Sequence, residues 1–332
     1  MSHWNQNAKS AKTLCLPAGQ EALAQAVTVL AAGGLVAFPT ETVYGLGADA
    51  TNGLAVARIY EAKGRPSFNP LIAHVIDIAA ARREGIFNAH AELLAHAFWP
   101  GPLTLVLPLA ATCSVCDLAR AGLDSVALRV PAHPVARALL AAFGKPLAAP
   151  SANRSGRISP TRADDVMAEL DGRCELVIDG GPAQVGLEST IIDCTGAEPI
   201  LLRPGGLARD DIENALGHPL TTATAGGKIN APGLLASHYA PGASLRLDAF
   251  SIEPGEAALD FHGQLSAFAP LATAYADLSP RGQLREAAAH LFASLRKLDA
   301  TGAGRIAVAP IPDDGLGEAI NDRLRRAAAP RG

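Results

Sequence analysis

The sequence contains few cysteines for its length, five among 332 residues, and their number is odd. A secreted protein held together by disulfides is usually short and rich in paired cysteines. Cys113 and Cys116 form a C-x-x-C pair, but no second pair or H-x-x-x-H supplies the remaining ligands of a structural zinc site. We therefore expect reduced thiols and no protein-bound metal.

Long apolar runs are also missing. The Ala-rich segments are interrupted by Gly, Pro or charge before the roughly 20 residues that cross a bilayer, and residues 1–12 (MSHWNQNAKSAK) contain no apolar signal-peptide segment. Neither sign of charge dominates, since 28 Lys and Arg oppose 32 Asp and Glu. Because there is no basic stripe with interleaved aromatics, tight nucleic-acid binding is not favoured. We expect a cytoplasmic globular protein that does not contact membranes.

Several catalytic signatures are absent as well. The chain has no G-x-S-x-G elbow, no H-E-x-x-H and no G-x-G-x-x-G after a strand. Gly181 and Gly186 have the spacing of a P-loop, but Leu187 and Glu188 occupy the positions that require Lys and Ser or Thr. The sequence therefore lacks the motifs that usually identify a serine hydrolase, a metalloprotease, a dinucleotide-dependent oxidoreductase or a P-loop protein.

What is present is an alternation of helical and strand-like segments, as in a mixed α/β sheet covered by helices. We expect the helix over 160–170 to have Ser159 as its N-cap and Pro160 in its first turn. A single core rarely grows beyond about 250 to 300 residues, so two domains are expected. The Gly-, Ala-, Thr- and Pro-rich segment 221–243 predicts a linker between a domain over 1–220 and a small α/β domain over 244–332, which has two strand-like and two helical segments.

Basic and hydroxyl side chains gather where apolar strands end. In FPTETVYGLGADA (38–50) we interpret the residues after the strand as a binding loop. Arg129 and Arg203 each end an apolar strand before a proline, a placement that favours convergence on an anionic ligand. Lys63 and Arg65 in KGRPSFNPL suit a phosphate or carboxylate. Taken alone, the pair is more simply interpreted as a cationic helix end that complements the helix dipole, but Asn69 and His74, which follow at once, weaken that interpretation.

These stretches, taken together and in order, resemble the threonylcarbamoyl-AMP synthase family, the YrdC-like proteins. The resemblance rests on FPTETVYGLGADA, KGRPSFNPL, PGPLTLVL, VALRVP, APSANRSGRISPT, GLESTIID and ILLRPGG, within about residues 20–210. The linker PGLLASHYAP and the tail resemble the long form of the family, which has an extra C-terminal domain. The resemblance implies a twisted, mixed, open α/β sheet of the YrdC-like type with a second, smaller α/β domain.

The resemblance also implies a reaction. L-Threonine, bicarbonate and ATP, with Mg²⁺, would give L-threonylcarbamoyl-AMP and pyrophosphate, making the protein a nucleotidyltransferase. A downstream threonylcarbamoyl-transferase complex would then modify tRNA. Carried over from the family, the L-threonine contacts are Thr40, Thr42, His74, Arg129 and Ser189. The nucleotide contacts are Lys63, Arg65, Asn69, Ser125, Ser151, Asn153, Ser159, Arg203 and Tyr239, with Lys63 and Arg65 also expected to act in catalysis.

One departure concerns the linker, where some relatives have a basic and aromatic run before H-Y-A-P. This chain has Leu234 to Ser237 there, followed by His238 and Tyr239. We expect Tyr239 to fold over the pocket, without a cationic phosphate contact from the linker. Two alternatives remain: an enzyme that forms a carbamoyl adenylate from carbamoyl phosphate, and an RNA-binding module.

Overall fold

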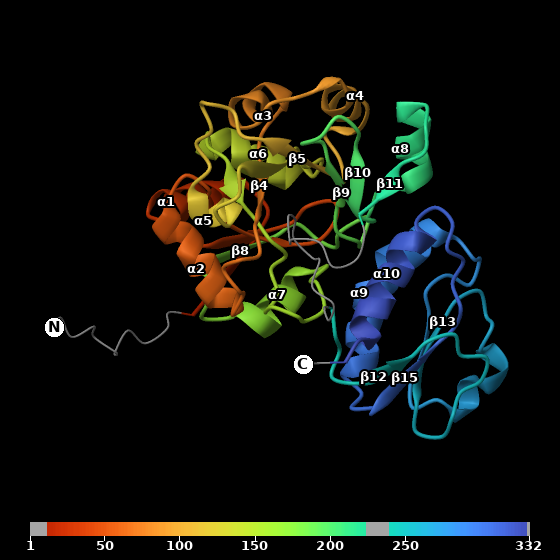
Figure 1. The fold of residues 1–332 in the computed structure, drawn as a ribbon. Helices are drawn as coiled ribbons and strands as arrows, with labels where there is room; N and C mark the ends of the chain where they lie inside the picture. The colour runs from red at the N-terminus through yellow and green to blue at the C-terminus, as the bar shows by residue number, and fades with distance from the viewer. Residues whose placement is uncertain (1–11, 224–238, 331–332) are drawn as a thin grey trace.

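The computed structural model describes residues 12–223 and 239–330, which form a large and a small domain (Figure 1). The large domain is built on an eleven-stranded mixed sheet in the order β1-β8-β2-β3-β7-β4-β6-β5-β9-β10-β11. Its strands are β1 (Leu14–Pro17), β2 (Val36–Phe38), β3 (Gly45–Asp49), β4 (Ile72–His74), β5 (Leu103–Pro108), β6 (Ser125–Arg129), β7 (Leu147–Ala148), β8 (Leu176–Asp179), β9 (Thr190–Asp193), β10 (Ile200–Arg203) and β11 (Thr221–Thr222). The mixed α/β class is therefore confirmed.

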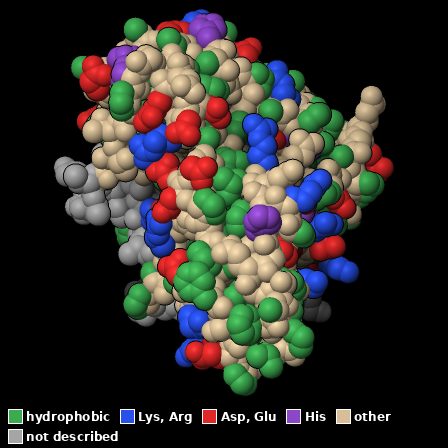
Figure 2. All heavy atoms as spheres, turned by 90° about the vertical axis from the view of Figure 1, so that its right-hand side faces the viewer, with side chains coloured by type: hydrophobic (Ala, Val, Ile, Leu, Met, Phe, Trp, Pro, Cys, Tyr) green, Lys and Arg blue, Asp and Glu red, His purple; other side chains and the backbone are tan. Residues whose placement is uncertain are grey.

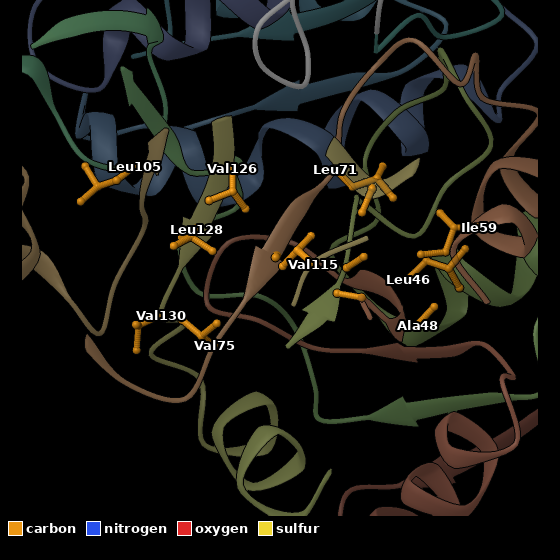
Figure 3. Packing of buried hydrophobic residues seen from close by; sticks show 14 of the residues in the cluster. Leu46, Ala48, Ile59, Leu71, Val75, Leu105, Val115, Val126, Leu128 and Val130 are labelled. Carbon is orange, nitrogen blue, oxygen red and sulfur yellow. The ribbon is translucent and has the colours of Figure 1, made fainter. Parts of the chain in front are cut away.

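Helices pack on both faces of this sheet. They are α1 (Gln20–Ala31), α2 (Gly53–Lys63), α3 (Ile78–Glu84), α4 (Ala89–Phe98), α5 (Asp117–Arg120), α6 (Pro134–Phe143), α7 (Ala163–Leu170) and α8 (Arg209–Leu216). Because strand side chains alternate between faces, Val36 and Phe38 pack with α1 and α6, whereas Ala37 joins the main core on the other face. Figure 3 shows part of that core, in which Leu46 of β3 lies near Ile59 of α2.

The same alternation leaves a polar area on the sheet. Ile72 and His74 point to the face opposite Ala73, which is in the main core. His74 is paired in register with Arg129 of the parallel neighbour β6. Two polar side chains therefore stand side by side on the part of this face that α1 and α6 do not cover.

The small domain has a four-stranded parallel sheet in the order β12-β15-β13-β14. Its elements are β12 (Ser244–Arg246), β13 (Ala257–Asp260), the 3₁₀ helix η1 (Ser266–Leu271), β14 (Tyr275–Asp277), α9 (Leu284–Asp299), β15 (Arg305–Val308) and α10 (Gly317–Ala328). The strands near 244 and 305 and the two long helices follow the sequence prediction. β13 and β14 were not predicted.

Helices α9 and α10 lie on the side of the small sheet that faces the large domain (Figure 1). A Cβ on Gly186 would come within 2.5 Å of the Ala288 carbonyl oxygen of α9, so the backbones of the two domains meet there. Arg296 of α9 lies 2.7 Å from Glu169, and Arg209 of α8 lies 2.5 Å from Glu318 of α10. The small domain is thus docked by close packing and ion pairs.

Three sequence expectations need correction. The stretch 38–50 is not all loop, because Gly45–Asp49 forms β3 antiparallel to β2. The helix expected over 160–170 begins at Ala163, where Asp165 accepts from the backbone N–H groups of Thr161 and Arg162. Ser159 is therefore not its N-cap. The sheet pairing of β11 extends the large domain to 222, two residues past the predicted limit of 220.

All five cysteines are free: Cys174 and Cys194 are buried, and the others are exposed or half-buried. Among the described residues no helix is both long and apolar enough to cross a bilayer. The linker residues Leu234 to His238 lie outside the described ranges. On the face in Figure 2, basic and acidic side chains are interspersed.

Candidate active site

A cavity opens over β4, β6 and the start of β9, on the polar area of the sheet, next to the small domain. Nine of its lining residues were predicted from the sequence: Thr40, Thr42, Arg65, His74, Arg129, Ser151, Ser189, Arg203 and Tyr239. Its other lining residues are Val43, Gly45, Ile72, Ala149, Pro150 and Glu188. Segments separated by more than a hundred residues are thus brought together at one place.

The loop after β2 presents its two threonines to the cavity. The hydroxyls of Thr40 and Thr42 lie 2.8 Å apart, and Arg129 donates from Nη1 to Thr42 Oγ1 at 2.9 Å. Glu41, between them, accepts from Arg129 Nη2 at 2.5 Å and from the Ala132 N–H at 3.0 Å. Burial opposes the charge of Glu41, but Arg129 holds the pKa of this carboxyl below its usual value. The Glu41–Arg129 pair fixes the loop, so the threonine hydroxyls are held in position.

Tyr44 of the same loop serves the fold. Its hydroxyl donates to the Gly181 carbonyl at 2.7 Å, and its side chain is fully buried in the main core. Of the polar residues in PTETVYG, Thr40 and Thr42 therefore face the cavity, whereas Glu41 and Tyr44 hold the loop in place.

His74 is buried at the cavity wall, and its Nδ1 has no hydrogen-bond partner among residues 12–223 and 239–330. Burial, assisted by the positive charge of Arg129, lowers the pKa of His74 to about 3. The imidazole is therefore neutral at physiological pH. A neutral ring with an unpaired buried nitrogen is suited to a hydrogen bond with a bound ligand.

We expect the buried His74 to make stability depend on pH. The pKa of His74 is about 3 in the folded protein and about 6.5 in an unfolded chain, so between these values the unfolded chain binds a proton that the folded chain does not. The free energy of unfolding should then fall as pH drops below 6.5, by up to about 1.4 kcal/mol per pH unit. Urea unfolding from pH 7.5 to 5 should show a shallower dependence in His74→Asn. The exposed His96→Asn should behave as wild type, and equal slopes in all three proteins would contradict this expectation.

Arg65 reaches the cavity from the turn after α2. Its Nε and Nη2 donate to the carbonyls of Asn69 and Pro70 at 3.3 and 3.0 Å. Burial lowers the pKa of Arg65 to about 10, so the guanidinium stays charged at neutral pH. An arginine fixed in this way is a pre-organised cation for an anionic ligand.

Lys63, at the end of α2, is not among the residues that line the cavity. Its Nζ donates to the Ser151 carbonyl at 2.5 Å and to that of Asn153. Burial, together with the charge of Arg65, lowers the pKa of Lys63 well below its usual value. In this structure Lys63 holds the 151–153 loop. Three side-chain atoms are buried without a hydrogen-bond partner in the described part of the chain: Oδ1 of Asn153, and Oδ1 and Nδ2 of Asn69.

Arg203 and Ser189 join at the end of the β9–β10 hairpin. Arg203 donates from Nη2 to the Ser189 carbonyl at 2.7 Å, and Ser189 Oγ lies 2.7 Å from Thr104 Oγ1. A Cβ on Gly205 would come within 2.4 Å of the Glu188 carbonyl oxygen. Position 205, in the PGG segment after Arg203, therefore has room only for glycine. The two strand-end arginines thus line one cavity, as the sequence indicated.

One part of the cavity lining lies where the two domains meet. Glu188 accepts from Ser159 Oγ and, at 2.7 Å, from Nε of Arg323 in α10, whose side chain is fully buried. Burial alone would raise the pKa of Glu188, but Arg323, Arg203 and the hydrogen bonds lower it to about 2. The Arg323 guanidinium lies 5.1 Å from the centre of the Tyr239 ring, which stacks on Phe292 of α9. The small domain therefore holds Tyr239 at the cavity.

Like Lys63, Asn69 and Asn153, two further predicted residues do not line the cavity. Ser159 is buried with its hydroxyl on Glu188, and Ser125 begins β6, at the opposite end of that strand from Arg129. Sequence reasoning missed Glu41, Glu188 and Arg323. A signal existed for Arg323 alone, since it falls three residues after Ile320 on the apolar stripe of its helix, where a charge is unusual.

Comparison with known proteins identifies the family. Residues 28–205 match a family model described as "Telomere recombination", and 207–329 match one described as "Threonylcarbamoyl-AMP synthase, C-terminal domain". The threonylcarbamoyl-AMP synthase of Bacillus subtilis is 42% identical over 93% of both chains. The chain belongs to the threonylcarbamoyl-AMP synthase family. It is accordingly an enzyme of the nucleotidyltransferase type, and the match includes the small domain.

Other relatives agree. The threonylcarbamoyl-AMP synthase of Schizosaccharomyces pombe is 35% identical, over 89% of this chain and 85% of its own. The crystal structure of Pyrococcus abyssi Sua5 complexed with L-threonine superposes with a TM-score of 0.86 at 38% identity, over 95% of this chain and 97% of that one. The boundary between the two family models precedes α8, whereas α8 and β11 pack in the large domain.

Proposed function

We propose that the cavity binds L-threonine beside Thr40, Thr42, His74, Arg129 and Ser189, and ATP beside Arg65, Ser151, Arg203 and Tyr239. The observation that carries this proposal is the charge of the lining: three arginines against one glutamate, a balance of 3 − 1 = +2, with a neutral histidine. Such a wall attracts a triphosphate and a carboxylate together. The solved complex of the Pyrococcus abyssi relative with L-threonine supports the amino-acid part.

The proposed chemistry proceeds by positioning. The amine of threonine adds to bicarbonate-derived CO2 and loses a proton, giving a carbamate. A carbamate oxygen then attacks the α-phosphorus of ATP, and the bond to the β-phosphate oxygen breaks to release pyrophosphate. Holding both substrates in line supplies much of the rate, and the guanidiniums of Arg65 and Arg203 would stabilise the charge on the phosphates. No covalent enzyme intermediate is required.

Mg²⁺ is proposed to enter with ATP rather than as a resident ion. Glu188 is the one carboxylate among the described lining residues, and its two oxygens already accept from Ser159 and Arg323. Mg²⁺ usually keeps several waters and binds through substrate phosphates. The donor set of the cavity therefore fits an ion that is bound through ATP rather than a resident one.

The partners beyond the cavity also belong to this proposal. The product, a mixed anhydride of a carbamate and AMP, is an activated acyl donor that must be passed on. We propose that a threonylcarbamoyl-transferase complex takes it for tRNA modification, in the cytoplasm.

Thr42→Val should weaken L-threonine binding and leave ATP binding nearly unchanged. Valine keeps the shape but removes a hydroxyl that lines the cavity and that Thr40 and Arg129 hold in position, so the bound amino acid would lose a hydrogen bond of about 1 to 3 kcal/mol. We expect KM for threonine to rise roughly 5- to 100-fold in steady-state assays. Thr28→Val, on the exposed face of α1, is the matched control. An unchanged KM for threonine would remove Thr42 from the proposed site.

An isotope-labelling experiment tests the proposed reaction. With ¹³C-bicarbonate, L-threonine and ATP, mass spectrometry should find one ¹³C in a threonine-containing adenylate. Carbamoyl phosphate should not replace bicarbonate. Product carrying no label from bicarbonate, with carbamoyl phosphate as an efficient donor, would instead assign the carbamoyl-adenylate alternative.

A further inference from the structure

Outside the cavity, three potential metal ligands meet on the surface of the large domain. They are His90 in the first turn of α4, Glu198 in the turn between β9 and β10, and His218 after α8. One ligand atom of each lies within 4.8 Å of the others. Figure 2 shows histidine side chains at the upper end of its face, at the height of α4 and α8 in Figure 1.

Both imidazoles are oriented by backbone carbonyls. Nδ1 of His90 lies 3.2 Å from the Ala197 carbonyl oxygen, and Nδ1 of His218 lies 3.0 Å from that of Pro219. A carbonyl oxygen only accepts, so Nδ1 of each neutral ring is the N–H that donates. Each Nε2 then keeps its lone pair. A histidine ligand in a metal site usually donates its other nitrogen to a carbonyl or carboxylate in this way.

The backbone around these side chains is also fixed. Asn88, the N-cap of α4, donates from Nδ2 to the carbonyls of Cys194 and Gly196, both at 3.0 Å. The β9–β10 turn, which carries Glu198, is therefore tied to the start of the helix that carries His90. The rings of His90 and His218 lie 5.7 Å apart, edge to face, and Nε2 of His218 lies 3.9 Å from a Glu198 carboxylate oxygen.

We propose that His90, Glu198 and His218 bind a divalent transition-metal ion of the zinc class, with water completing the coordination. Two imidazoles and a carboxylate are a set that Zn²⁺ takes in proteins. Tetrahedral bonds of about 2.0 to 2.1 Å place ligand atoms roughly 3.4 Å apart, so the three side chains need to close by about 1 Å. Glu198 is 70% exposed and His218 38% exposed, which leaves them room to move.

The site would act as a clamp at the edge of the sheet. Ser189 and Arg203 are at one end of the β9–β10 hairpin and Glu198 is in the turn at the other. A bound ion would join α4, this turn and the segment after α8 without touching the cavity. Metal binding should therefore stabilise the fold and leave the rate of the adenylation reaction unchanged.

The test is zinc titration of the untagged full-length protein by calorimetry, with ZnCl2 as the only ligand. Because thiolates are potential zinc ligands, the titrations use a Cys113→Ser/Cys116→Ser background, so that any binding measured is independent of the C-x-x-C pair. We expect one zinc ion per chain and a melting temperature that rises by a few degrees at a hundredfold excess over Kd. Co²⁺ should give visible ligand-field bands without a sulfur charge-transfer band.

His90→Ala, His218→Ala and Glu198→Gln should each weaken zinc binding at least tenfold. His96→Ala is the matched control, since His96 is on the same helix, 65% exposed, and should bind zinc as the background does. Glu198→Gln hardly changes the volume of the side chain. It therefore tests zinc binding even if the histidine variants fold poorly. Absence of zinc binding in the background, or tight binding that survives all three substitutions, would overturn the proposal.

Discussion

Replacing Arg65 with methionine is expected to slow threonine-dependent pyrophosphate release by about 100- to 1,000-fold, mainly in kcat. The guanidinium is fixed by the carbonyls of Asn69 and Pro70 and lines the cavity where the phosphates are proposed to bind. Removing one pre-organised donor to developing charge typically has an effect of this size. Methionine keeps most of the volume, so packing should be largely preserved. Steady-state release of pyrophosphate measures the effect directly.

Arg58→Met is the matched control for Arg65. Arg58 is in α2, the helix that precedes Arg65, and its ion pair with Glu175 is 42% and 41% exposed. We expect its kcat to stay within a factor of two or so of wild type, since surface pairs contribute about 0 to 1 kcal/mol. If Arg65→Met kept wild-type kcat and KM for ATP, the nucleotide half of the proposed site would have to be placed elsewhere.

Replacing Arg323 with methionine is expected to destabilise the protein by about 3 to 5 kcal/mol, because the buried Glu188 loses its ion-pair partner across the domain interface. The pKa of Glu188, now about 2, should rise with the loss of that charge. Activity should fall as well, since Tyr239 lies against Arg323 at the cavity. Urea unfolding at pH 7.5 measures the stability.

A double-mutant cycle separates the ion pair from other effects. Because Glu188→Gln removes the uncompensated charge, Glu188→Gln/Arg323→Met should be more stable than the sum of the single changes predicts, by about 0.5 to 3 kcal/mol. Arg325→Met is the control in the same helix, where a 60% exposed arginine pairs with Asp313 and should contribute about 1 kcal/mol or less. Additive effects at Glu188 and Arg323 would contradict a coupling between the domains through this pair.

The sequence predicted most of the fold where periodicity was strong. The strands ending at Arg129 and Arg203 follow from short apolar runs, and the apolar stripe of α9 follows from helical spacing. β3 was missed because Gly45 and Gly47 are poor strand formers, and they are accepted here since Phe38 of the neighbouring strand packs over Gly47. β14 was missed because its residues, Tyr275–Asp277, contain no run of bulky apolar side chains.

The cavity was predicted more fully than the contacts within it. Arginines and hydroxyls at strand ends indicated a binding site, the family resemblance added further residues, and nine of the residues predicted in these two ways line one cavity. Glu188 could not be assigned, because its partner Arg323 is 135 positions away in another domain. Ser159 was read as a helix cap or nucleotide contact for the same reason, since a local pattern does not reveal a carboxylate brought in by tertiary packing.

The most direct test of the central claim is pyrophosphate release from ATP by the purified full-length protein, with L-threonine and bicarbonate added singly and together. The charge and shape of the cavity predict release that requires both co-substrates and that falls by two orders of magnitude or more in Arg65→Met. Release that is equally fast without threonine, or none with all substrates and Mg²⁺ present, would contradict the proposed use of this cavity.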